Sequence, residues 1–257
     1  MIDKAQDEYE FEQKKINHIF HYTSRCEVLE KIIRNGFQPS YCKEQIRDRK
    51  YLSPMVSFCN IPIGEVDKYV RYGKNGIGMS MEWAIKNKVN PVLYIHEGSE
   101  YMNILNNEHL MESNFLNDGV SSANKLLSNI KYWKTNHKNK SINTYQEREW
   151  RFVPSLDKNL DKNLDKKMLI IDKAINNSEY EKICANKKST PHFPNHKLVI
   201  ESISDISYIV VTTEKQRKNL IEVLKAKFDN DDKKVVNEAL INGGLSIFLA
   251  SRIRDDF

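Results

Sequence analysis

The sequence predicts an α+β fold with a mixed central sheet, a helical insertion and C-terminal helices. Short runs rich in β-branched and aromatic residues recur at 18–23, 55–59, 92–95 and 145–153, which is typical of strands. Segments with helical periodicity separate these runs. No Gly/Ser-rich or Pro-rich linker divides residues 1–257, so we expect one domain.

The first half of the chain alternates between the two kinds of element. After the strand at 18–23, an apolar stripe at 28–33 predicts a helix, and Gly36 is placed to end it. The polar stretch 38–53 is interpreted as a surface loop. The apolar strand at 55–59 follows it.

The second half contains the insertion and the C-terminal helices. Helical periodicity over about 98–134 predicts an inserted helical pair. A charged near-repeat at about 155–167 has little apolar content and predicts an exposed loop. A strand at 206–211, an amphipathic helix at 213–228 and one or two helices within 234–250 complete the prediction.

Composition restricts the class of protein. Hydrophobic residues make up 40% and charged residues 29%, and no apolar run approaches the ~20 residues that a membrane helix needs. The N-terminus is acidic and polar where a secretory signal is basic and then apolar, so we expect a cytoplasmic protein without a membrane partner. The net charge of +5 permits a nucleic-acid partner without requiring one.

Cysteine and histidine spacing predicts no metal site. None of the four cysteines forms a Cys-x-x-Cys pair, so we expect reduced and mostly buried thiols. His192 and His196 are four residues apart, but Pro194 breaks any helix that would place them on one face. The cysteines are Cys26, Cys42, Cys59 and Cys184.

The segment from Glu147 to Phe152 carries the clearest chemical pattern. Read as a strand, it places Glu147, Glu149 and Arg151 on one face and the aromatic residues on the other. The aromatic face is then core, and the acidic face lines a cleft or lies in water. Two neighbouring carboxylates repel, so one gains a raised pKa or a cationic partner. Such a pair suits a catalytic acid or a cation-stabilising group, but charged strand faces are usually solvated, so the residues alone favour an edge strand whose glutamates pair with arginines in water.

Polar residues on three separate strand segments form a recognisable order along the chain. An early His-aromatic-Thr motif is followed by a Ser and a Tyr, and then by Glu-x-Glu. The residues are His21, Tyr22, Thr23, Ser57, Tyr72, Glu147 and Glu149. This order resembles that of ADP-ribosyltransferase folds, including DNA-modifying toxins of the DarT type.

A longer set of segments resembles one family more specifically. The segments are 21–23, Gly36, 54–62, 72–80, Trp83, 90–94 and 147–151. In this order, over about residues 18 to 215, they resemble the AbiGi family of abortive phage-resistance proteins. That resemblance implies a bacterial antiviral protein, described in the family as the antitoxin partner of a second, toxic protein.

The ADP-ribosyltransferase resemblance implies a central sheet of that type and a role for each glutamate. Breaking the nicotinamide–ribose bond of NAD passes through an oxocarbenium-like state, which a carboxylate beside the ribose stabilises. Glu149 takes this role by resemblance, and Glu147 polarises the acceptor.

The same resemblance implies a binding site for NAD as substrate, without a metal. His21 would bind an adenosine ribose hydroxyl with Tyr22 and Thr23 beside it, Ser57 would lie in the same cleft, and Tyr72 would stack on nicotinamide. The structural alternative is that the histidine and the tyrosines are core residues.

Three functions therefore stay open. The first and favoured one is NAD-dependent ADP-ribosyl transfer to a nucleic acid or a protein. The second is a non-catalytic antitoxin of the same fold that binds a partner toxin. The third is a nucleic-acid-binding module in which basic and aromatic residues interleave at Lys131, Tyr132, Trp133, Lys134, Lys138 and Lys140.

Overall fold

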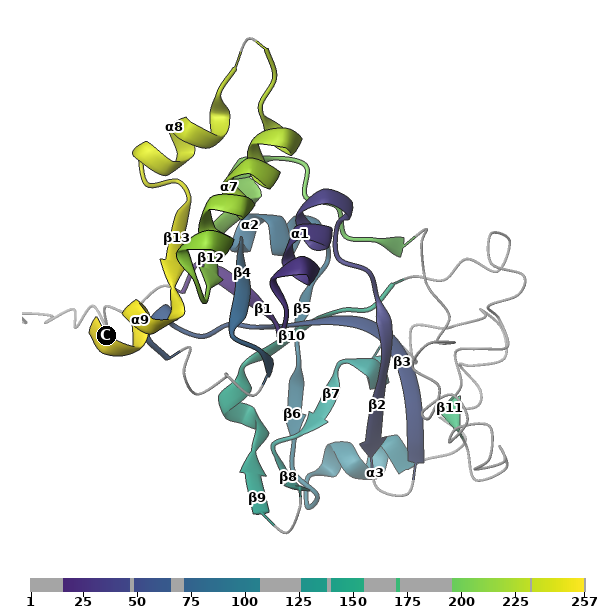
Figure 1. Ribbon diagram of the computed structural model, residues 1–257. Coiled ribbons are helices and arrows are strands. Elements are labelled where there is room, and N and C mark those ends of the chain that lie inside the picture. Colours follow the sequence, from purple (N-terminus) through teal and green to yellow (C-terminus); the bar gives the residue numbers. More distant parts are fainter. Residues whose placement is uncertain are drawn as a thin grey trace, which may run out of the picture.

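A nine-stranded sheet forms the centre of the molecule (Figure 1). The computed structural model describes residues 16–46, 49–65, 72–106, 126–137, 140–154, 170–171, 196–231 and 233–256. The strands of this sheet are β1 (His18–Thr23), β2 (Ser40–Ile46), β3 (Arg49–Cys59), β4 (Asn75–Ser80), β5 (Asn90–Pro91), β10 (Glu149–Phe152), β11 (Ile170–Ile171), β12 (Ile206–Val211) and β13 (Ser246–Leu249).

The strand order confirms a mixed α+β architecture. The path runs β13-β12-β4-β1-β3-β10-β5, and β2 and β11 pair with β3 beside it. Only the β12–β13 pair is parallel within the described part of this sheet; its other pairs are antiparallel.

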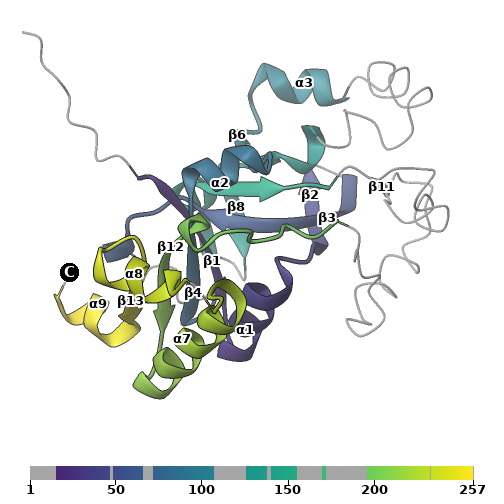
Figure 2. The same ribbon diagram turned by 90° about the horizontal axis from the view of Figure 1, so that it is seen from above.

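Helices cover one face of the sheet (Figure 2). α1 (Cys26–Asn35) and α7 (Glu214–Phe228) pack against each other there, with α2 (Met81–Lys86) and α8 (Val235–Ile241) nearby. The main core lies between these helices and the sheet. A smaller core on the other face includes Phe20, Tyr22 and Cys59, and it is joined by Ile253 of α9 (Ala250–Asp256).

Local sequence signals define the ends of the two main helices. Gly36 follows α1 with φ +81°, and its N–H donates to the carbonyl of Ile32, as a C-terminal glycine should. Thr213 and Gln216 form a reciprocal capping box at the start of α7. Both helix ends agree with the sequence prediction.

Two strand pairs border the helical insertion predicted over about 98–134, and residues 107–125 of that insertion lie outside the described residues. β6 (Leu93–Ile95) pairs in parallel with β7 (Ile130–Tyr132), and β8 (Lys134–His137) pairs with β9 (Lys140–Asn143). α3 (Glu100–Asn106) agrees with the helical prediction, whereas the prediction over 130–134 is wrong. The apolar spacing there is shared by a helix and by the buried face of a short strand, and pairing with β6 decides between them.

The predicted surface loop at 38–53 is wrong, because residues 40–46 and 49–53 belong to two paired strands. β2 pairs with β3 from Ser40 opposite Met55 to Ile46 opposite Arg49. β3 meets β1 at Phe20 opposite Cys59, and its earlier half is paired with β2 instead. β1 and β3 therefore separate, and the site described below lies where they part.

The charged near-repeat predicted at about 155–167 lies outside the described residues. Across the described ranges no helix combines the length and apolarity needed to cross a membrane.

Candidate functional site

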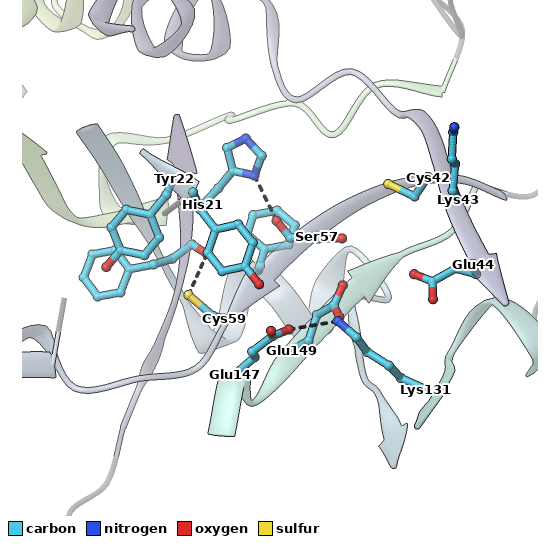
Figure 3. A pocket seen from close by; sticks show the side chains of 13 residues that line it. His21, Tyr22, Cys42, Lys43, Glu44, Ser57, Cys59, Lys131, Glu147 and Glu149 are labelled. Atoms are coloured by element: carbon cyan, nitrogen blue, oxygen red, sulfur yellow. Dashed lines mark hydrogen bonds and ion pairs between the residues drawn. The ribbon is translucent and has the colours of Figure 1, made fainter. Parts of the chain in front are cut away.

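A cavity of about 420 Å³ lies beside the separation of β1 and β3 (Figure 3). Its wall includes six of the seven predicted site residues, namely His21, Tyr22, Ser57, Tyr72, Glu147 and Glu149. It also includes Lys131, which the sequence assigned to a nucleic-acid-binding segment, and residues that the sequence did not indicate as site residues, notably Cys42, Lys43, Glu44 and Cys59. The cavity therefore gathers groups from distant parts of the chain.

Glu149 and Arg151 form the buried centre of the site. Strand alternation on β10 turns both side chains to one face, and the two residues are 8% and 1% exposed. Arg151 Nε donates to Glu149 Oε1 at 2.8 Å, and Nη2 donates to Oε2 at 3.1 Å. Nη1 donates to the Ser128 carbonyl at 2.6 Å, and Nη2 also reaches Glu44 Oε1 at 2.6 Å. Arg151 therefore ties β10 to β2 and to the segment before β7.

Lys131 joins the two predicted glutamates. Its Nζ donates to Oε2 of Glu147 and to Oε2 of Glu149, both at 2.8 Å. The lysine is 19% exposed and each glutamate side chain 9%. The expectation that neighbouring carboxylates acquire a cationic partner is therefore confirmed.

The ion pairs set the protonation of the cluster. Burial acts to raise the pKa of Glu149, but Arg151 and then Lys131 outweigh it and lower this pKa to about 2. For Lys131, burial opposes the charged form, yet the two glutamates raise its pKa above the usual value. Burial raises the pKa of Glu44 in spite of Arg151. With three carboxylates against two cations, this side-chain cluster holds one excess acidic group.

Glu147 reaches the cluster by a different route from the one predicted. It ends the 3₁₀ helix η2 (Thr144–Glu147), and Arg148 follows with φ +43° in the left-handed region. The predicted continuous strand from 145 is therefore wrong before Glu149. A backbone hydrogen bond closes this turn, in which the Arg148 N–H donates to the Tyr145 carbonyl. This turn places the Glu147 carboxylate within hydrogen-bond distance of the Lys131 ammonium group.

His21 borders the cavity, but its ring points to the other face of the sheet. Phe20 lies opposite Cys59, and Cys59 lies opposite Glu149, so these three side chains share a face. His21 alternates away from it, and Figure 3 shows its ring directed away from the glutamates. Its Nδ1 lies 2.9 Å from the Ser57 carbonyl, and burial lowers its pKa although that contact acts to raise it. The predicted NAD site requires His21 and Glu149 to meet in one cleft; both border the cavity, but their side chains lie on opposite faces of the sheet.

The His21 ring packs among aromatic side chains of the main core. It makes edge contacts with Phe37 and Phe58, with ring centroids 5.4 and 5.7 Å apart. This environment agrees with the structural alternative for the histidine.

The other predicted NAD-binding residues differ in their positions. Tyr22 stacks on Phe20 with ring centroids 5.5 Å apart, and Tyr72 is 46% exposed on the cavity wall. The backbone carbonyl of Ser57 is within hydrogen-bond distance of the His21 ring. Thr23 is not in the cavity wall as far as the structure describes it; its hydroxyl donates to the Arg25 carbonyl and accepts from the Arg25 N–H.

The two thiols of the cavity are poor nucleophiles. Burial raises the pKa of Cys42 to about 11 and moves that of Cys59 further upward. Cys26, Cys42 and Cys59 are free thiols, and Cys184 lies outside the described residues. No group of metal-binding side chains occurs in the ranges that the structure covers.

The basic and aromatic segment at 131–140 is divided between two environments. Lys131 is held by the glutamates, whereas Lys134 lies over the Trp133 ring at 4.4 Å from its centroid. Lys138 lies outside the described residues. Lys131 is thus committed to the acidic cluster rather than to a solvent-facing basic surface.

Sequence reasoning missed Glu44 altogether. It assigned Lys131 to a nucleic-acid-binding segment, and it placed Arg151 on the face of Glu149 without a role in the site. The position of Arg151 two residues after Glu149 was a usable signal for their pairing. Glu44 and Lys131 are brought in by long-range strand pairing, for which the sequence contains no local signal.

Comparisons with known proteins match this chain to one protein family. Residues 35–212 match the family described as "Putative abortive phage resistance protein AbiGi, antitoxin". The chain is 27% identical over 210 residues to the "Abortive phage resistance protein AbiGi" of Lactococcus lactis subsp. cremoris, with 72% of this chain and 82% of that protein covered. No solved structure matches it.

Proposed function

Since the chain belongs to the AbiGi family of abortive phage resistance proteins, we propose that it acts as an antitoxin that restrains a partner toxin by binding it. The family description supplies the antitoxin role and thereby a protein partner. Restraint of this kind requires a complementary surface and no chemical turnover.

The state of Glu149 is the observation that favours binding over catalysis. A carboxylate that stabilises an oxocarbenium-like centre needs an oxygen available to the substrate. Here Oε1 accepts from Arg151, and Oε2 accepts from Lys131 and Arg151. A developing positive charge beside Glu149 would also be repelled by both cations. The cluster is therefore better suited to holding β10, β2 and β7 together than to bond cleavage.

Co-purification tests this proposal. The chain is purified together with the protein encoded by the neighbouring gene, and the mixture is separated by size-exclusion chromatography. We expect one complex at micromolar concentration. Elution as two separate proteins contradicts the antitoxin role.

ADP-ribosyl transfer from NAD to a nucleic acid or a protein is the second candidate. It is supported by the single cavity that six of the seven predicted residues border. The test is incubation of the chain with labelled NAD and cell RNA, DNA or lysate, followed by label transfer and nicotinamide release. The antitoxin proposal expects neither product. Transfer by the wild type that is lost in Glu149→Gln would replace it with the enzymatic function.

A further inference from the structure

The outer edge of the nine-stranded sheet is a strand without the usual protection. β13 ends the sheet and, within the described residues, pairs only with β12 (Figure 1). Its sequence from Ser246 to Leu249 contains no charge and no proline, and all four residues are half-buried. Edge strands of this kind can pair with another chain.

The opposite edge is built differently. β5 is only two residues long, and its second residue is the exposed Pro91, which has no N–H to offer to a further strand. One end of the strand path is therefore blocked, and the other is open to pairing.

A groove of about 350 Å³ lies next to β13. α7, α8 and β13 contribute to it, and its wall is mostly apolar. A strand added to an edge turns alternate side chains toward each face, so an apolar side chain of that strand can enter such a groove. The apolar wall residues are Ile221, Leu240, Leu245, Ile247 and Phe248, and Arg217 adds a charge.

On α7, α8 and α9, which surround this edge, Lys and Arg outnumber Asp and Glu, and Arg217 is the charged residue of the groove wall. α7 carries five Lys or Arg residues and two Glu residues. Arg217 pairs with Glu214 at 2.9 Å, yet its side chain is still 42% exposed. Arg252, just after β13, is also exposed. An acidic segment complements this environment.

We propose that β13 and the adjacent groove receive an extended acidic segment of the partner protein by β-strand addition. An apolar side chain of that segment fills the groove, and a carboxylate meets Arg217. This proposal rests on the proposed partner-binding function and locates its surface. A second copy of this chain suits the edge poorly, because antiparallel pairing of two β13 strands would bring two basic α7 helices to the same face.

Two charge substitutions test the surface in the full chain. Arg217→Glu reverses the groove charge, and Ser246→Glu places a carboxylate on the edge without removing an apolar contact. We expect each to weaken binding of the neighbouring-gene protein by about tenfold or more in calorimetric titration. Lys218→Glu is the matched control, since it is exposed on the same helix outside the groove wall. Circular dichroism confirms that every variant is folded.

The outcomes separate this surface from the antitoxin role. If the wild type and both edge variants bind the partner equally, strand addition at β13 is excluded while the antitoxin role stands. Loss of a wild-type dimer in Ser246→Glu would instead assign the edge to a second copy and overturn the proposal.

A peptide experiment decides the case in which no complex with the neighbouring protein forms. A short peptide that alternates valine with glutamate is added, and amide hydrogen exchange is measured. We expect slower exchange at Ser246–Leu249, and no change with a valine–lysine peptide. This result would support the surface even if the antitoxin role failed, whereas unchanged exchange with both peptides would overturn the proposal.

Discussion

Arg151 Nε lies 2.8 Å from Oε1 of Glu149, so one short strand carries both members of a buried ion pair. The same guanidinium reaches Glu44 on β2 and the Ser128 carbonyl. A planar group with several N–H donors in fixed directions can serve these partners at once. Arg151 thereby connects parts of the chain that no local interaction would join.

Replacing Arg151 by lysine should destabilise the fold. Lysine keeps the charge but cannot reach the Glu149, Glu44 and Ser128 oxygens together, so a buried partner loses its donor. We expect Arg151→Lys to lower the free energy of unfolding by about 3 kcal/mol in denaturant titration. Arg217→Lys, on the surface, is the control and should change it by less than about 1 kcal/mol. Equal effects of the two substitutions would contradict the role of Arg151.

Lowering the pH should reduce the free energy of unfolding, because Glu149 becomes protonated and loses its ion pairs. Its pKa is about 2 because Arg151 and Lys131 outweigh the effect of burial, and the ordinary value is 4.5. A carboxyl group with a lowered pKa in the folded state contributes stability above its ordinary pKa and loses it as the pH falls toward the folded value. We therefore expect a loss on the order of 3 kcal/mol between about pH 4.5 and pH 2.

Denaturant titrations of the wild type and of Glu149→Gln at several pH values measure this contribution. Glu44 opposes the trend because burial raises its pKa, so the difference between the two proteins is the informative quantity. An identical pH slope in both proteins would show that Glu149 is not held ionised.

Lys131→Met should expose the repulsion between the two glutamates. Without the ammonium group, Glu147 and Glu149 lose the cation that each contacts at 2.8 Å. We expect a clear fall in melting temperature at neutral pH, corresponding to about 2 kcal/mol or more. Adding Glu147→Gln to Lys131→Met should restore part of the loss. A double variant no more stable than Lys131→Met would indicate that lost packing, rather than repulsion, causes the change.

Local sequence patterns predicted part of the fold and of the site. Alternation correctly placed Glu149 and Arg151 on one face, and Gly36 correctly marked the end of α1. The Glu-x-Glu spacing also identified two carboxylates that share a cation, although Glu147 reaches it from η2 rather than from the strand.

Long-range pairing explains the main errors. The stretch 38–53 is loop-like by composition, yet pairing between β2 and β3 makes both of its described halves strands, and β2 carries Glu44. The helices predicted within 234–250 are wrong at Ser246–Leu249, which forms β13 through parallel pairing with β12, a strand distant in the sequence. His21 was expected to meet Glu149 in one cleft, but the register of β1, β3 and β10 determines the face of each side chain, and sequence spacing does not reveal it.

Gly36 should tolerate no side chain. Its φ is +81°, and a Cβ there would lie 2.4 Å from the Leu198 carbonyl oxygen. Gly243 has a similar φ of +80° but nothing within 4 Å of its Cβ position, so it isolates the effect of backbone strain. We expect Gly243→Ala to cost about 1 kcal/mol and Gly36→Ala clearly more, measured by thermal unfolding. Equal losses would mean that the contact with Leu198 relaxes without cost.

The antitoxin role is tested most directly by bacterial growth. The protein encoded beside this chain is induced alone or together with it, and viable colonies are counted. We expect induction alone to arrest growth and co-expression of the wild-type chain to restore colonies by about a hundredfold or more, since a tightly bound toxin is withdrawn from its target. Equal arrest with and without the chain, at matched protein levels, would contradict the proposed function.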